Sequence, residues 1–493
     1  MDQRTEKIIA NILTLAFLAF FCMLAVTSTA IFEGADNIAH YNLSHYSFRH
    51  PELLLDHWGK PLFTILSSPF SQAGFVGTKL FNVLTGVAAA YFAYRYLRSQ
   101  KVQMAFAVIP FVLFVPMYFM MMQSALTEVL CSFILVVSAF CFADKRYILS
   151  AILLSFVPVS RTDAVIILPV YAAALLWFRQ YKALPFLLTG TFVFSISGWF
   201  QYGDILWLIH NNPYKGASSL YGKGDLLHFV EQIPYISGIP LTILTVTGIS
   251  SILFRFFRNN AHPGEPATAD VFVLLLPALA LLAAHSYLWW KGLGGSAGLT
   301  RVLTPVLPLT AIMAYKGFDE ITWRIPVKWV RWLILLVVLF FIILVPVRKY
   351  RPPAKLQKAD LLMSQTADWI KSEGLQNRNI FYYDPEVAFF NDRDPWNHEK
   401  GRQIIRDGFV NETIFGEGSL IIWDAHFGPH EGRVPLSLLL ENKQLRLIKV
   451  LLPNPPFTIY GNEEYCIYVF LKDRTHAPHD NFAIEKELRS THF

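Results

Sequence analysis

Residues 31–70, IFEGADNIAHYNLSHYSFRHPELLLDHWGKPLFTILSSPF, form a charged segment that directly follows the first long apolar run of the chain. Ionised side chains this close to hydrocarbon cost several kcal/mol each unless they face water or one another. The segment therefore predicts a functional site at a membrane surface. Its ionisable residues are Glu33, Asp36, His40, His45, Arg49, His50, Glu52, Asp56, His57 and Lys60.

The composition predicts a polytopic membrane protein. Of 493 residues, 54% are hydrophobic and only 16% are charged, which lies outside the range of soluble domains. The apolar run 8–32 is about as long as a membrane span of ~20 residues requires, so we interpret it as a retained first helix and not a cleaved signal peptide. A net charge of +6 without a long basic block argues against nucleic-acid binding.

Apolar runs bounded by Pro, Gly or charged residues predict about eleven transmembrane helices. If the N-terminus is cytoplasmic, the connections on the cytoplasmic side contain more Lys and Arg than those on the outer side. This charge bias favours a cytoplasmic N-terminus and, with eleven spans, an extracytoplasmic C-terminus. The expected spans lie near 8–31, 75–97, 102–121, 124–143, 147–160, 163–178, 184–202, 236–257, 270–290, 300–316 and 329–347.

The chain divides into a membrane part, residues 1–348, and a soluble α/β domain, residues 349–493, of roughly 140 residues, enough for its own core. The pattern predicts a helix over 356–373 and strands over 379–383, 419–423, 445–452 and 465–471. In the membrane part, three segments fall on the outer side and mix charged residues, aromatic residues and Gly. They are 31–70, 203–235 and 285–301, and we expect the chemistry there.

Asp36 follows the first span at the depth where lipid headgroups begin. A carboxylate partly screened from water binds protons more tightly and can serve as a general base, although Asp is also a common helix cap. His57 and Lys60, in DHWGKP, could face a lipid phosphate, or they could be interfacial anchors.

Glu128, in SALTEVL, lies at the outer end of an apolar run and needs a partner. Arg161 and Asp163, in VSRTDAV, are the natural candidates, and they could equally pair with each other in a purely structural ion network. Arg301, in GLTRVLTPVLP, offers a planar fork that matches phosphate oxygens, or it could be a snorkelling anchor. Supporting candidates are Tyr221, Lys223 and His285.

In the C-terminal domain, IIWDAHFGPHEG brings together side-chain types that bind metals: Asp424, His426, His430 and Glu431. Their spacing matches no metal-binding pattern, so a polar loop after a strand is the favoured interpretation. Four cysteines without a CxxC pair predict neither a disulfide framework nor a metal site. The sequence requires no cofactor, and it leaves a role for a divalent cation open.

Residues 8–309 resemble the GT-C class of membrane glycosyltransferases, in particular the protein O-mannosyltransferases and the lipid A aminoarabinose transferases. The motifs are Asp36 after the first span, HWGKPL (similar to His-x-Pro-Leu), LTEVL (similar to Leu-Thr-Glu-Pro-Leu), SRTDA (similar to Arg-x-Glu-Gly) and GLTRVLTPVLPL. The chain departs from the class where Asn37 follows Asp36 in place of a second acid, and where Asp163 and Ala164 replace Glu-Gly.

The resemblance implies transfer of a sugar from a polyprenyl-phosphate carrier to a hydroxyl of a protein, lipid or glycan on the outer face, usually with inversion. It implies Asp36 as base and Arg301 as a cation that holds the phosphate, assisted by Lys60 or His57, with Glu128 and Arg161 shaping the cavity. Two alternatives remain at this point. One is a lipid-sugar transporter or flippase, and the other is a non-catalytic membrane assembly protein.

Overall fold

The structure, a computed structural model, describes residues 3–215, 221–404, 415–459, 463–473 and 480–490. These residues form two compact units. Unit 1 consists of residues 1–28 and 43–354 and is helical, whereas unit 2 consists of residues 29–42 and 355–493 and contains a sheet. The sequence interpretation placed residues 29–42 with the membrane part, but in the structure they group with the C-terminal residues.

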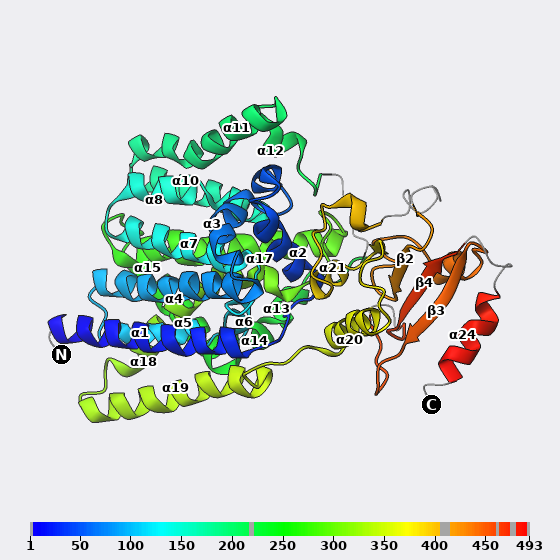
Figure 1. Cartoon of the computed structure of the whole chain (residues 1–493). Coiled ribbons are helices and arrows are strands. Elements are labelled where there is room, and N and C mark those ends of the chain that lie inside the picture. Colours follow the sequence, from blue (N-terminus) through cyan, green and yellow to red (C-terminus); the bar gives the residue numbers. More distant parts are fainter. Residues whose placement is uncertain (1–2, 216–220, 405–414, 460–462, 474–479, 491–493) are drawn as a thin grey trace. The chain divides into compact units, whose positions relative to one another are not determined.

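Unit 1 is built from helices that run side by side, as α1, α4 and α7 do in Figure 1. Its elements are α1 (Gln3–Thr27), η1 (Pro51–Leu55), α3 (Pro61–Ser71), α4 (Phe75–Ser99), η2 (Ala105–Ala107), α5 (Val108–Leu113), α6 (Pro116–Met121), α7 (Glu128–Ala143), α8 (Tyr147–Leu154), α9 (Val157–Ser160), η3 (Thr162–Ile166), α10 (Ile167–Trp177), η4 (Tyr181–Leu188), α11 (Thr189–Tyr202), α12 (Trp207–His210), α13 (His228–Glu231), α14 (Ile233–Ser237), α15 (Ile239–Arg258), α16 (Pro266–Asp270), η5 (Val271–Leu275), α17 (Leu276–Lys291), η6 (Thr300–Val306), α18 (Leu307–Thr322) and α19 (Lys328–Tyr350).

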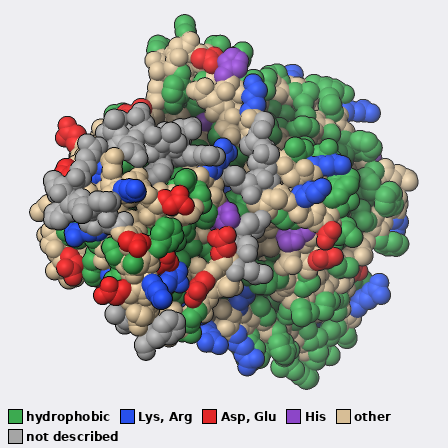
Figure 2. Space-filling model, turned by 90° about the vertical axis from the view of Figure 1, so that its right-hand side faces the viewer, with side chains coloured by type: hydrophobic (Ala, Val, Ile, Leu, Met, Phe, Trp, Pro, Cys, Tyr) green, Lys and Arg blue, Asp and Glu red, His purple; other side chains and the backbone are tan. Residues whose placement is uncertain are grey.

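Six helical stretches of the described residues are long and apolar enough to cross a membrane. They are Arg4–Thr27, Phe75–Ser99, Tyr181–Tyr202, Ile239–Arg258, Pro266–Lys291 and Lys328–Tyr350. Shorter apolar helices cover Glu128–Ala143, Tyr147–Ser160 and Thr162–Trp177. Unit 1 is therefore a multi-pass membrane unit, and Figure 2 shows broad areas of exposed hydrophobic side chains. Within the described residues, the exposed large hydrophobic side chains outside unit 1 are those of Leu361, Leu438 and Phe482.

The expected continuous span over 102–121 differs in the structure, which has two six-residue helices there, α5 and α6. Pro116 begins α6 and disfavours helical backbone at the residue before it. Val115 accordingly has extended torsions, φ −58° and ψ 121°, and the helix is interrupted at this point.

A buried polar cluster ties α4, α16 and α18 together inside unit 1. Asp270, 2% exposed, forms an ion pair with Lys316 and accepts hydrogen bonds from Tyr96 (2.7 Å) and Gln100 (3.0 Å). A buried carboxylate needs such partners, because an unpaired charge in an apolar interior is strongly unfavourable. These contacts fix the end of the helical unit at which α4 finishes.

Unit 2 contains a four-stranded sheet of order β1-β2-β4-β3, formed by β1 (Ile380–Tyr382), β2 (Leu420–Asp424), β3 (Leu445–Leu451) and β4 (Ile467–Lys472). β1 pairs with β2 in parallel, and β4 pairs with β2 and β3 in antiparallel fashion. Successive strand residues point to opposite faces. Ile422 packs towards α20 (Lys358–Ser372), while Ile421 packs in the cluster that includes Leu439 of α23 (Leu436–Leu440).

Because both faces of this sheet are covered, β1, β2 and β4 are largely apolar runs. β3 differs, because Arg446 and Lys449 stand among its apolar residues in half-buried positions, yet the sequence located all four strands. The helix expected over 356–373 is α20. The described residues of unit 2 also form α21 (Glu386–Phe390), η7 (His398–Lys400) and α24 (Asn481–Ser490). α2 (Ala35–Tyr46) begins in unit 2.

The close approach of α15 to α18 depends on two glycines. A Cβ added at Gly317 would lie 2.1 Å from the carbonyl oxygen of Leu244, and one at Gly248 would lie 1.9 Å from that of Met313. Small residues at such crossings let membrane helices pack backbone to backbone.

We predict that Gly317→Ala destabilises unit 1, because backbone atoms cannot move aside as a flexible side chain could. The loss should be on the order of 1–3 kcal/mol, the usual cost of overpacking. Thermal unfolding of the detergent-solubilised protein measures it. Gly264→Ala is the matched control, since a Cβ there would meet only the His262 ring at 3.2 Å. Equal melting temperatures for the two variants would contradict the prediction.

Candidate functional site

A buried ion network joins Glu128, Arg161, Asp163 and His285. The Arg161 guanidinium contacts Glu128 Oε1 at 2.5 Å through Nη1, and it binds Asp163 through Nε (3.0 Å to Oδ1) and Nη2 (2.6 Å to Oδ2). His285 Nε2 lies 3.0 Å from Asp163 Oδ2 and donates to it. The network thus fastens the start of α7 to η3 and to α17.

The sequence analysis offered Arg161 as a partner either of Glu128 or of Asp163. In the structure Arg161 forms ion pairs with both carboxylates. Two carboxylates share this one guanidinium, and the His285 ring gives Asp163 a further hydrogen-bond partner. A purely structural ion network would show the same pairing. The network sets the geometry of the surrounding helix ends.

Lys60 has an unusual backbone conformation and a buried side chain. It precedes α3 with φ 63° and ψ 92°, in the left-handed half of the torsion map that non-glycine residues rarely adopt, and Pro61 follows it as the first helical residue. Its side chain is only 5% exposed. The ammonium donates to Tyr214 Oη (3.0 Å) and to the carbonyl oxygen of His57 (3.4 Å).

The partners of the Lys60 ammonium are neutral. In the described ranges no carboxylate oxygen lies within ion-pair distance of it, and the Tyr214 ring lies below it at 4.7 Å. A buried cation without a counter-charge is costly, so an anionic ligand would be strongly favoured at this position. His57 packs edge-on against Trp207, and burial, followed by the Lys60 charge, lowers the pKa of the His57 imidazole, which stays neutral at pH 7.

Arg301 lies in η6 and is 7% exposed. η6 packs against α7 and α17, so Arg301 belongs to the end of unit 1 at which Glu128 and His285 also lie. The turn before it is fixed by His228, whose Nε2 lies 2.9 Å from the carbonyl oxygen of Gly298. We call this part of unit 1, defined by Lys60, Glu128, Arg161, His285 and Arg301, the polar end.

The remaining predicted residues of unit 1 are less enclosed. Tyr221 is half-buried, and Lys223 is exposed. Their segment lies beside the end of α17, because the Gly224 amide donates to the carbonyl oxygen of Trp289 at 3.3 Å. This connects the loop 221–224 with the polar end without placing Lys223 in a buried position.

Asp36 belongs to unit 2, where it lies in the first turn of α2. Its negative charge acts on His426, although burial, together with the neighbouring His430, lowers the His426 pKa below its usual value. Nearby in the same unit, Glu386 Oε1 lies 3.8 Å from where a Cβ would stand on Gly34. Asp36 is thus carried by a segment that packs against the C-terminal residues.

The carboxyl edge of the parallel β1–β2 pair gathers further acids in unit 2. Asp384 and Glu386 follow β1, and Asp424 ends β2. Burial, and then the charge of Asp424, raises the pKa of Asp384 well above its usual value, while burial raises the pKa of Asp424 to about 6. These carboxyl groups therefore retain protons more readily than surface acids, which limits their mutual repulsion.

The described residues contain no group of three or more His, Cys, Asp or Glu side chains arranged to hold a metal ion. In the loop Asp424–Glu431, the Asp424 side chain hydrogen-bonds to backbone amides of the same loop. Asp424 Oδ1 accepts the amides of His426 (2.9 Å) and Phe427 (2.7 Å).

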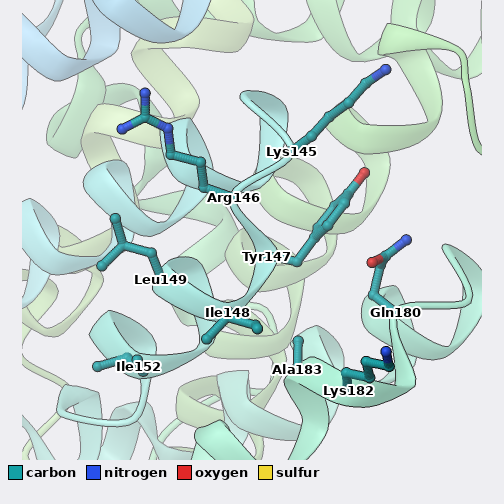
Figure 3. A pocket seen from close by; sticks show the side chains of 9 residues that line it. All are labelled: Lys145, Arg146, Tyr147, Ile148, Leu149, Ile152, Gln180, Lys182 and Ala183. Atoms are coloured by element: carbon teal, nitrogen blue, oxygen red, sulfur yellow. The ribbon is translucent and has the colours of Figure 1, made fainter.

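A surface hollow of about 500 Å³ lies at the opposite end of the helices (Figure 3). Its lining includes Lys145, Arg146 and Lys182 beside apolar residues such as Ile148 and Ile152. Lys145 and Arg146 follow the last residue of α7, whereas Glu128 is its first. A helix of this length separates the two by about 24 Å, and no carboxylate is among the lining residues of the hollow.

Sequence reasoning missed two residues that the structure makes prominent. Tyr214 contacts Lys60 although 154 positions separate them in the sequence, so no local motif could indicate this pair. Lys79, 1% exposed, donates to the carbonyl oxygen of Ser28 at 2.7 Å, just past the end of α1. A charged residue inside an apolar run was the available signal for Lys79.

Neither a family model nor a curated protein matches this sequence. Solved structures do. ArnT from Cupriavidus metallidurans, bound to undecaprenyl phosphate, superposes with a TM-score of 0.59 at 11% identity, and its apo state with 0.60 at 10% identity. Both matches cover 93% of this chain and 97% of the other.

The archaeal oligosaccharyltransferase AglB from Archaeoglobus fulgidus, in complex with an inhibitory peptide and a dolichol-phosphate, superposes with a TM-score of 0.50 at 11% identity over 91% of this chain and 74% of that chain. ArnT and AglB are glycosyltransferases of the GT-C class. The resemblance drawn from the short motifs is confirmed in the fold: this chain has the GT-C architecture.

Proposed function

We propose that this protein is an integral membrane glycosyltransferase that takes a sugar from a polyprenyl-phosphate carrier and passes it to a hydroxyl acceptor. The observation that carries the proposal is the buried Lys60 ammonium, whose partners are all neutral and which would be compensated by a phosphate. The fold supports it, because the similar ArnT structure holds undecaprenyl phosphate and the AglB structure a dolichol-phosphate.

The chemistry divides into two tasks. In the transition state the bond between the sugar and the phosphate oxygen breaks, positive charge builds on the sugar, and negative charge builds on the departing phosphate. Lys60 and Arg301, both buried cations of the polar end, suit the phosphate. Asp36 accepts the proton of the acceptor hydroxyl as the new glycosidic bond forms.

The network around Arg161 has a supporting role in this scheme. It holds the starts of α7 and η3 together with α17, the elements against which η6 and Arg301 pack. His57, Tyr221 and Lys223 line the approach in the same scheme. We also propose that the polar end faces the extracytoplasmic side, with the N-terminus in the cytoplasm and eleven crossings of the membrane.

Lys60→Met should weaken carrier binding at least tenfold, because the isosteric apolar side chain removes the charge without leaving a large cavity. Binding of a polyprenyl phosphate to the detergent-solubilised protein, followed by native mass spectrometry, measures the loss. Lys182→Met is the control, since this lysine lies in the hollow at the opposite end of the helices. Unchanged binding by the Lys60 variant would remove the phosphate role from Lys60.

Asp36→Asn should lower the rate of sugar transfer by a factor on the order of 10²–10⁴, the usual contribution of a general base, and leave carrier binding intact. Release of free polyprenyl phosphate from a radiolabelled polyprenyl-phosphate sugar, in the presence of a cell-envelope acceptor fraction, reports the rate. A transporter or an assembly protein would release none in either form. Near wild-type turnover by Asp36→Asn would overturn Asp36 as the base.

The orientation predicts that a reporter fused after residue 493 is active only outside the cytoplasm. Alkaline phosphatase, which needs an oxidising compartment, should therefore be active in this fusion, and a green fluorescent protein fused at the same place should be dark. A fluorescent C-terminal fusion would place the C-terminus in the cytoplasm and contradict the proposed side.

A further inference from the structure

The segment that carries Asp36 leaves the helical unit at the same point as the C-terminal domain does. Ser28, the last residue of unit 1 before this segment, donates through Oγ to the carbonyl oxygen of Ala354 at 2.9 Å. Ala354 is the last residue of unit 1 before residues 355–493. Lys79 binds the Ser28 carbonyl oxygen from inside unit 1. The two connections are thus fixed to each other and to α4.

Beyond this point, the segment 29–42 packs on α21 of unit 2. The Tyr41 ring meets the Phe389 ring edge-on, with centroids 5.7 Å apart and planes at 89°, and Tyr41 is only 8% exposed. Aromatic pairs in this geometry stabilise by about 0.5–1.5 kcal/mol beyond their burial. At the other end of the segment, Gly34 adopts φ 58° close to Glu386. Asp36 lies between these two contacts.

His426 lies on the loop that follows β2, and β2 pairs in parallel with β1, the strand that leads into α21. Its backbone is fixed by Asp424, and the indole of the preceding Trp423 donates to the carbonyl oxygen of Val434 at 2.8 Å, which closes the loop. The His426 ring lies 6.2 Å from that of His430, centroid to centroid. His426 is therefore a half-buried imidazole on a rigid loop, within electrostatic reach of the Asp36 carboxylate.

We propose that unit 2 is part of the catalytic machinery, in which α21 holds the helix that bears Asp36 and His426 acts as a positioning residue for the Asp36 carboxylate. The inference rests on the proposed role of Asp36 as the base. It assigns to the C-terminal domain a function that neither its sequence nor the comparisons provide.

The two parts of the proposal act on different kinetic quantities. Loosening α2 displaces the base from the acceptor hydroxyl, and small displacements of a reacting group cost large factors in rate without weakening the binding of the carrier. Removing the His426 imidazole takes away a group that can stabilise the Asp36 anion when protonated. The charged and titratable groups on the elements around His426 are Asp36, Asp384, Glu386, Asp424, His430 and Glu431.

The first test is Phe389→Ala, with Phe390→Ala as the matched control. Phe390 packs with the core on the α20 side of the sheet, not with Tyr41 in the described contacts. We expect kcat to fall by about tenfold in Phe389→Ala, with KM for the polyprenyl-phosphate sugar within about twofold of wild type. A fall in both parameters, or in neither, would overturn the role of α21.

The second test is the pH profile of kcat for His426→Gln, which keeps hydrogen-bonding capacity and removes the titrating charge. The rate should rise with pH as the base loses its proton, and this rise should move to higher pH by roughly half a unit or more in the variant. His398→Gln, in η7 (His398–Lys400), is the control and should keep the wild-type profile. An unshifted profile would show that His426 has no positioning role for the Asp36 carboxylate.

The pH profile remains a test of unit 2 if Phe389→Ala proves unstable, because His426 is half-buried and its replacement leaves the Tyr41–Phe389 pair in place. Failure of this inference is distinct from failure of the proposed function. If Asp36→Asn is inactive while Phe389→Ala and His426→Gln behave as wild type, unit 2 has no such role, yet the transferase proposal stands.

Discussion

The structure depends on a simple electrostatic constraint: a charge buried among apolar helices must find a partner. Arg161 meets it by bonding to Glu128 and Asp163 together, and His285 extends the chain of contacts to α17. Three elements that are separate in the sequence, α7, η3 and α17, are held in one arrangement as a result. The buried ammonium of Lys60 stands out against this pattern, since its partners are a phenol and a carbonyl group. The first set of charges is paired within the protein, whereas the printed partners of Lys60 are neutral groups, which is why we propose it as a ligand for a phosphate.

This contrast supports a division of labour at the polar end. The paired charges define where the helices begin, whereas Lys60 and Arg301 face an anion in the proposed reaction. The strained backbone of Lys60 fits the same view, because such torsions persist only where the surroundings impose them. Asp36, the base under the proposal, belongs to unit 2.

Much of the fold could be predicted, because the length of the apolar runs and the periodicity of hydrophobic residues indicate where helices and strands lie. β1, β2 and β4 of unit 2 are buried on both faces and are therefore largely apolar, and the sequence located all four strands to within a few residues. The run 102–121 looked equally apolar, but Pro116 divides it, and hydropathy does not register a backbone restriction. The pairing of Arg161 followed from the cost of leaving Glu128 alone. The contact of Tyr214 with Lys60 depends on how a long loop returns to the helices, which no local pattern encodes.

The grouping of residues 29–42 with the C-terminal domain has a consequence for how the protein is made. The ribosome synthesises Tyr41 more than 300 residues before Phe389, its aromatic partner, so the early segment cannot complete its packing until the last domain has emerged. Such long-range contacts form late and slowly during folding. A chain interrupted before residue 355 would insert its helices but lack the surface on which α2 settles, and biogenesis would thereby couple the appearance of activity to a finished polypeptide.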